Sequence, residues 1–140
     1  MKTSDLLRHQ LIRSLTTQGS DRGEGTAVDL WAPMATQLIL IIGAGGFDSL
    51  YARSVFLSQS SYPWLPACSG PPFTDQRFAD LNISLQAQPP PVAGEANALL
   101  LITFTDILAS MIGERLTTRI LNSAWHIDSK DPANKEINNA

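Results

Sequence analysis

Residues 30–47 form an uninterrupted stretch of 18 residues without Asp, Glu, Lys or Arg. A stretch of this length reaches the lower limit for a membrane-spanning helix. It also contains Pro33, Thr36, Gln37 and three glycines, so its strongly apolar part covers only residues 38–42. These interruptions lower its mean hydropathy. We therefore expect a buried segment of a soluble domain and no membrane partner.

Charged residues are scarce in two long segments of the chain. Charged residues make up 16% of the 140 residues, whereas they make up about 25% of an ordinary soluble domain. The net charge is -3 at pH 7. Residues 26–60 hold 3 of the charged residues and residues 92–125 hold 5. This composition excludes a disordered chain, a coiled coil and a nucleic-acid binder. Both segments must bury more than one face, under other helices or against a second copy of the chain.

The single cysteine, Cys68, indicates a reducing compartment, because secreted domains seldom leave one thiol unpaired. The amino-terminal region carries Lys2 and Arg8 and has no unbroken apolar run before a small-residue cleavage site. We therefore expect a cytoplasmic protein.

Apolar residues recur at helical spacing near the start of the chain. In residues 4–18, Leu7, Leu11 and Leu15 lie four apart, with Leu6 and Ile12 beside them, and predict an amphipathic helix. The basic residues Arg8, His9 and Arg13 lie elsewhere around this helix.

Proline punctuates the middle of the chain, since seven of the nine prolines lie within residues 62–91. A short helix is predicted from residue 74 to the three consecutive prolines, and residues 93–125 form the longest unbroken helical pattern. The sequence predicts a single all-α domain over residues 1–125. We expect a compact bundle of four to five helices with two long central segments and a Pro-rich connector, followed by a disordered polar tail at residues 126–140.

The sequence LILIIGAGGF at residues 38–47 resembles the start of a Rossmann dinucleotide-binding domain. In that family, a buried strand leads into a glycine-rich turn where the backbone approaches a pyrophosphate. Gly43 and Gly45 match the first two glycines, whereas Asp48 stands in the place of the third. The resemblance covers about ten residues, and no alternation of strands and helices follows. It implies nucleotide binding through the turn at residues 43–46.

The interpretation we favour for this segment is helical. Gly43, Gly45 and Gly46 would bend a helix or allow another helix to approach closely, and Gly113 would be the partner in that crossing. Gly43 and Gly113 each follow an isoleucine and precede an apolar pair by seven residues. This similarity is too slight to predict a repeat.

Residues with catalytic or metal-binding chemistry are few. His9 and His126 lie near opposite ends of the chain and Cys68 stands alone, so we expect no metal site and no cofactor. The chain also lacks a Gly-x-Ser-x-Gly nucleophile motif. We therefore assign no catalytic residues.

Polar residues interrupt the two apolar segments: Asp48, Tyr51, Arg53, Asp106, Glu114, Arg115 and Arg119. Arginines can hold a carboxylate or phosphate through paired N–H donors, so our candidate site for a small anionic ligand consists of Tyr51, Arg53, Glu114, Arg115 and Arg119. The interpretation we favour is that Asp48 and Glu114 pair with these arginines as salt bridges that fix the register of the helices.

We expect a small non-enzymatic helical interaction or regulatory module that self-associates, as a homodimer or with another protein. Apolar helical surface is plentiful, whereas catalytic residues are sparse. A small-ligand binder or enzyme that uses Arg53, Arg115 and Arg119, and a nucleotide binder that uses residues 43–46, are the alternatives.

Overall fold

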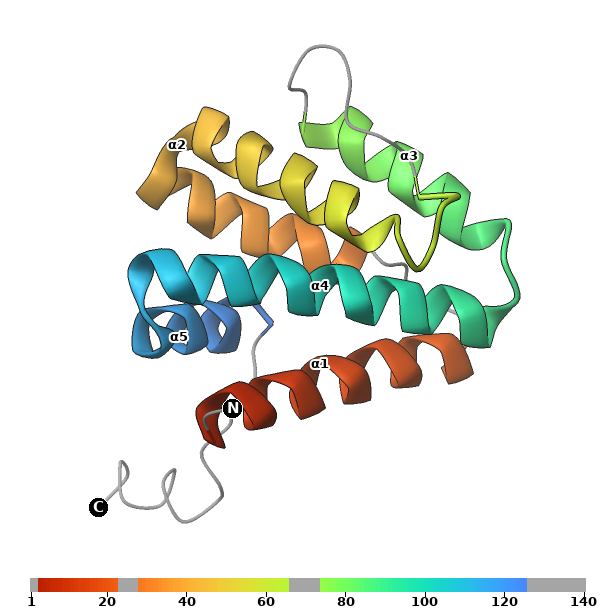
Figure 1. Ribbon diagram of the computed structural model, residues 1–140, viewed down its shortest axis with the longest axis horizontal. Helices are drawn as coiled ribbons and strands as arrows, with labels where there is room; N and C mark the ends of the chain where they lie inside the picture. Colours follow the sequence, from red (N-terminus) through yellow and green to blue (C-terminus); the bar gives the residue numbers. More distant parts are fainter. Residues whose placement is uncertain (1–2, 23–27, 66–73, 126–140) are drawn as a thin grey trace.

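A computed structural model describes residues 3–22, 28–65 and 74–125. These residues form an all-α bundle without strands (Figure 1), which confirms the predicted fold class. The helices are α1 (Thr3–Arg22), α2 (Val28–Ser58), α3 (Thr74–Gln86), α4 (Pro90–Ile112) and α5 (Glu114–Ala124). The expected tail at residues 126–140 and the connector residues 66–73, which include Cys68, lie outside the described residues.

Helix α2 is a hairpin of two helical arms, residues 28–42 and 44–58, joined at Gly43. The glycine has φ 83° and ψ 158°, far from helical values. Figure 1 shows the two arms running back along each other. In agreement, the rings of Trp31 on the first arm and Tyr51 on the second lie 5.2 Å apart, centroid to centroid.

A second reversal, at Gly113, separates α4 from α5. The backbone there has φ 97° and ψ 151°, close to the values at Gly43. This conformation is essentially restricted to glycine, because a side chain would clash with the backbone. The predicted unbroken helix over residues 93–125 is therefore wrong: the segment folds back on itself.

The sequence suggested that these glycines allow two helices to cross closely. The structure shows no such crossing at Gly43 or Gly113. A Cβ atom placed on Gly43 or Gly113 would have no neighbour within 4 Å, so their role is conformational. Gly45 and Gly46 lie in the helical second arm of α2. Residues 38–42 are also helical, so the strand that a Rossmann motif requires is absent, and that resemblance is not a structural one.

The two halves of the chain repeat the same arrangement at a spacing of 70 residues, which separates Gly43 from Gly113. One helix precedes one helical hairpin in each half: α1 and α2 in the first, then α3 and the α4–α5 pair. Eight buried residues of α2 each have a buried counterpart 70 residues later in the chain. The pairs are Trp31 and Leu101, Met34 and Phe104, Ala35 and Thr105, Leu38 and Leu108, Phe47 and Thr117, Leu50 and Ile120, Tyr51 and Leu121, and Ser54 and Ala124. This repeat is hard to recognise in the sequence, because corresponding positions are buried in both halves but mostly carry different residues.

The two hairpins lie side by side, with both turns at one end of the bundle, at the left of Figure 1. Helices α1 and α3 flank them on opposite sides. Helix α1 packs on α4 and on α5, whereas α3 packs on α2 and α4. The first half therefore places its outer helix on the hairpin of the second half.

Trp31 lies at the centre of the core and is fully buried. Its ring meets those of Tyr51 and Phe104 edge-on, each at 5.2 Å, and that of Phe78 at 6.1 Å. Its indole Nε1 donates a hydrogen bond of 2.9 Å to Asn97 Oδ1. This one side chain thus links both arms of α2 to α3 and α4.

Candidate functional site

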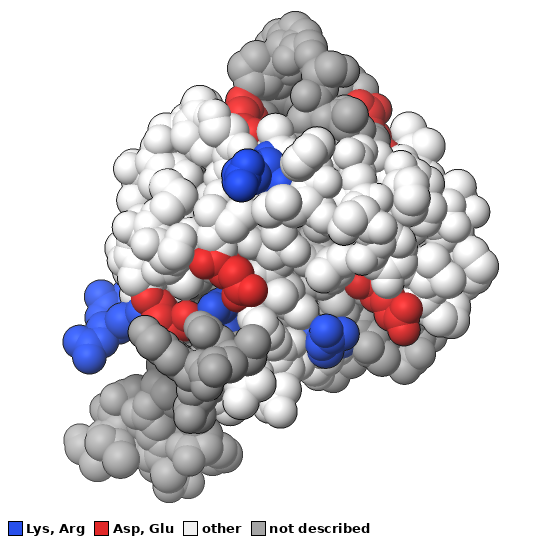
Figure 2. All heavy atoms as spheres, in the orientation of Figure 1, with Lys and Arg blue, Asp and Glu red and all other residues white. Residues whose placement is uncertain are grey.

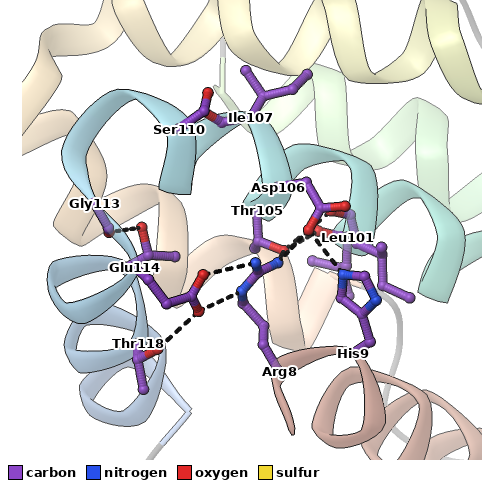
Figure 3. Close-up of polar contacts among 12 residues, drawn as sticks. Arg8, His9, Leu101, Thr105, Asp106, Ile107, Ser110, Gly113, Glu114 and Thr118 are labelled. Carbon is purple, nitrogen blue, oxygen red and sulfur yellow. Dashed lines mark hydrogen bonds and ion pairs between the residues drawn. The ribbon is translucent and has the colours of Figure 1, made fainter. Parts of the chain in front are cut away.

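An ion cluster joins α1 to α4 and α5 beside the α4–α5 turn (Figure 3). Arg8 donates from Nε and Nη2 to the two carboxylate oxygens of Glu114, both at 2.9 Å. Its Nη1 donates to Asp106 Oδ1 at 2.6 Å and to Thr105 Oγ1 at 2.9 Å. One guanidinium from α1 thus binds two carboxylates from different helices.

His9 completes the cluster at its outer side. Its Nε2 lies 2.8 Å from Asp106 Oδ1, the oxygen that also accepts from Arg8. On the other side, the Thr118 hydroxyl donates to Glu114 Oε2 at 3.2 Å. Only 2% of the Arg8 side chain is exposed, compared with 45% of the Asp106 side chain. The cluster therefore has a buried cation and a solvent-facing carboxylate.

The environment of Arg8 favours its charged form. Burial alone would lower the pKa of the guanidinium, but the hydrogen bonds and negative charges of Glu114 and Asp106 outweigh burial and raise that pKa above its usual value. Arg8 is thus a permanent cation whose partners supply the compensating charge. A buried ion pair of this kind is costly to break, because the remaining charge stays buried without a partner.

The residues predicted to hold an anion do not form one site among the described contacts. Arg53 is exposed on the second arm of α2, and Arg115 and Arg119 are exposed on α5. Tyr51 is buried in the aromatic core. Glu114 binds Arg8, an arginine far from it in the sequence.

Sequence reasoning missed Arg8, His9 and Thr105. The face of α1 that lies against the bundle carries Arg8, Ile12 and Thr16, which are buried. Of the apolar residues predicted on this helix, Ile12 is buried and Leu11 and Leu15 are partly buried, whereas Leu7 is 61% exposed. The only sequence signal was the spacing of four between Arg8, Ile12 and Thr16, which is the same as that of the leucines.

Exposed apolar side chains gather at the end of the bundle where both hairpin turns lie. Six of the nine large hydrophobic side chains exposed among the described residues belong to the first turns of α1 and α5 or to the last residues before a glycine turn. We call these six the apolar end: Leu6, Leu7, Leu40, Ile41, Met111 and Leu116. Leu40 is the most exposed, at 83%.

Charge is absent from the two turns themselves. Neither residues 38–47 nor residues 107–113 contain Asp, Glu, Lys or Arg. On the face drawn in Figure 2, most of the surface is uncharged; one group of acidic and basic residues lies at the lower left, where α1 meets α4 and α5, and the other charged residues are scattered. The apolar end thus lies next to the ion cluster, and Glu114 directly follows the Gly113 turn.

Two helical stretches, Leu30–Ser58 and Pro90–Ile112, are long and apolar enough to cross a membrane by length and composition alone. The reversal at Gly43 divides the first into arms of at most 15 residues, shorter than the ~20 that a span requires. Within its most apolar 18-residue window only 28% of the residues are buried, compared with 50% in the second stretch. The folded chain therefore leaves much of the apolar surface of α2 uncovered.

No protein family, curated protein or solved structure matches this chain. Among residues 3–22, 28–65 and 74–125, no group of three or more His, Cys, Asp or Glu side chains could hold a metal ion.

Proposed function

We propose that the protein is a non-enzymatic helical interaction module that self-associates through the apolar end, as a homodimer in the cytoplasm. The observation that carries this proposal is the concentration of exposed large apolar side chains at one end of the bundle. Exposed contiguous apolar surface is typical of contact sites, because burying it in an interface is favourable.

A second copy of the chain is the partner that this surface fits best. Symmetric dimers bring the same patch of both subunits together, so any charge near the centre faces a like charge. The two hairpin turns carry none. Arg115 and Arg119 are exposed on α5 beside the end, where they would lie in the polar rim that surrounds most interfaces.

Replacing Leu40 by glutamate is expected to weaken the dimer at least about tenfold, because a buried unpaired carboxylate must either lose its solvation or take up a proton. The free energy of unfolding should change little, since Leu40 is exposed in the monomer. Sedimentation equilibrium of the full chain over a range of concentrations measures the dissociation constant, and circular dichroism checks the fold.

Ile83→Glu is the matched control, since Ile83 is also exposed but lies on α3 and not at the apolar end. It should leave the dimer intact. A wild-type chain that stays monomeric at all concentrations, or an Ile83→Glu effect as large as that of Leu40→Glu, would overturn the proposal. Flotation of a monomeric wild-type chain with anionic lipid vesicles would instead identify a membrane surface as the partner.

A further inference from the structure

The repeat gives both hairpin turns an exposed apolar residue at the same position. Ile41 stands two residues before Gly43, and Met111 stands two residues before Gly113. Ile41 is 50% exposed and Met111 is 59% exposed, and both belong to the apolar end. The two turns therefore present similar apolar side chains with different chemistry, since the thioether sulfur of methionine is open to oxidation.

Met111 supplies most of the exposed apolar surface of the second turn. Of the large hydrophobic side chains in residues 107–112, it alone is exposed, and the others are at least partly buried. In the first turn Leu40 is also exposed, but its counterpart 70 residues later is Ser110. A chemical change at Met111 thus alters the main contact that the Gly113 turn can offer.

The other methionine that the structure describes is protected. Met34 lies on the first arm of α2 and is fully buried. An oxidant dissolved in water must reach the sulfur atom to react, so it reacts first with exposed methionines. Met1 and Cys68 lie outside the described residues. Within residues 3–22, 28–65 and 74–125, Met111 is therefore the sulfur that an oxidant reaches first.

Oxidation converts the Met111 side chain from apolar to polar. Hydrogen peroxide transfers one oxygen atom to the thioether: an S–O bond forms, the O–O bond breaks, sulfur is oxidised by two electrons and the peroxide is reduced to water. The product is a methionine sulfoxide, whose oxygen accepts hydrogen bonds.

The apolar end offers this oxygen no obvious donor once it is buried. Neither turn contains a charged side chain. The hydroxyl next to Met111, that of Ser110, already donates to the Ile107 carbonyl oxygen at 2.6 Å, and the N–H of Gly113 donates to the Ala109 carbonyl oxygen at 2.8 Å. A second copy would bring the same surface to the contact. Burying a polar group without a hydrogen-bond partner is costly, so oxidation opposes the contact.

We propose that Met111 is an oxidation site that controls self-association: peroxide converts it to the sulfoxide, and the oxidised chains separate. This control rests on the proposed function, because it acts at the apolar end. It works in both directions, since association buries Met111 and oxidation opposes its burial. The dimer is thus shielded from the oxidant, and methionine sulfoxide reductases reverse the change.

Hydrogen peroxide treatment of the full chain carrying Cys68→Ser, which removes the competing thiol, tests the site. Mass spectrometry of peptides should show an oxygen atom added to Met111 before Met34. The dissociation constant measured by sedimentation equilibrium should rise by about tenfold, and a methionine sulfoxide reductase should restore it. Equally fast oxidation of Met34, or complete oxidation of Met111 with an unchanged dissociation constant, would overturn the proposal.

Failure of this control is distinguishable from failure of the dimer. A Cys68→Ser chain that is monomeric before peroxide is added contradicts the proposed function and, with it, the control. A dimer that withstands peroxide although Met111 is oxidised contradicts the control alone. Protein concentration gives a further measure, because Met111 should be oxidised more slowly above the dissociation constant than below it. Equal rates would exclude Met111 from the interface.

The first turn supplies the matched variant. Met111→Ile gives the second turn the residue found at the equivalent position, Ile41, so the dimer should form as before and no longer respond to peroxide. A response as large as that of the parent chain would show that another group is its cause. Ile41→Met combined with Met111→Ile should restore the response through the first turn. Resistance of this exchanged variant would contradict the equivalence of the two turns.

Met111→Gln tests the effect of polarity without any oxidant, because glutamine is polar, unbranched and similar in length to methionine. It should raise the dissociation constant in the same direction as peroxide does. Circular dichroism should show an intact fold, since Met111 is exposed in the monomer. A Met111→Gln chain that dimerises as tightly as the parent would contradict the proposal.

Discussion

Replacing Trp31 by alanine is expected to lower the free energy of unfolding by about 3–5 kcal/mol, the largest effect of any single change considered for this chain. The indole is fully buried and contacts three other aromatic rings. Its removal leaves a cavity between both arms of α2, α3 and α4. It also leaves the amide of Asn97 without its indole donor.

Urea denaturation followed by circular dichroism measures this loss, with an unchanged m value indicating two-state unfolding. Ile83→Ala removes a large side chain that is exposed on α3 and should cost less than about 0.5 kcal/mol. A loss below about 1.5 kcal/mol for Trp31→Ala would show that the aromatic group is not the centre of the core.

Gly43→Ala and Gly113→Ala are each expected to lower the free energy of unfolding by about 1–3 kcal/mol. Both glycines have positive φ with extended ψ, which an alanine adopts only under strain. Space is not the reason, because a Cβ at either position would contact nothing within 4 Å. Since the two turns have nearly the same backbone geometry, the two losses should agree closely.

Gly45→Ala is the matched control for these variants. Gly45 lies in the helical second arm of α2, and an added Cβ there also meets nothing within 4 Å. Alanine has a higher helix propensity than glycine by about 1 kcal/mol, so this change should be neutral or stabilising. Equal losses at all three glycines in thermal unfolding would argue against the conformational explanation.

Local periodicity was sufficient to predict the helices but not their reversals. The spacing of apolar residues indicated helical segments over residues 26–60 and 93–125, and helices occupy residues 28–58 and 90–124 apart from the glycine at which each reverses. A glycine within a helical pattern is compatible with a straight helix, a bend or a complete reversal. Which of these occurs at Gly43 depends on contacts such as that of Trp31 with Tyr51, which lie outside any local sequence window.

The ion cluster could not be predicted from the sequence for a related reason. Two stripes on α1, one through Leu7 and one through Arg8, have the same spacing, and general hydrophobicity favours burial of the leucines. The structure buries Arg8 because its partners lie on α4 and α5, separated from it by 98 and 106 residues. Pairing over such distances leaves no periodic signal in the chain.

These separations also have a consequence for the order of folding. Each helical hairpin closes between residues near in sequence, so its contacts form early and with little loss of chain entropy. Helix α1 finds its partners only after α4 and α5 exist, because its anchoring residue pairs with Glu114. During synthesis from the amino terminus, α1 is made before α4 and α5 and can dock only after them. Until then the nascent chain carries it as an unattached segment.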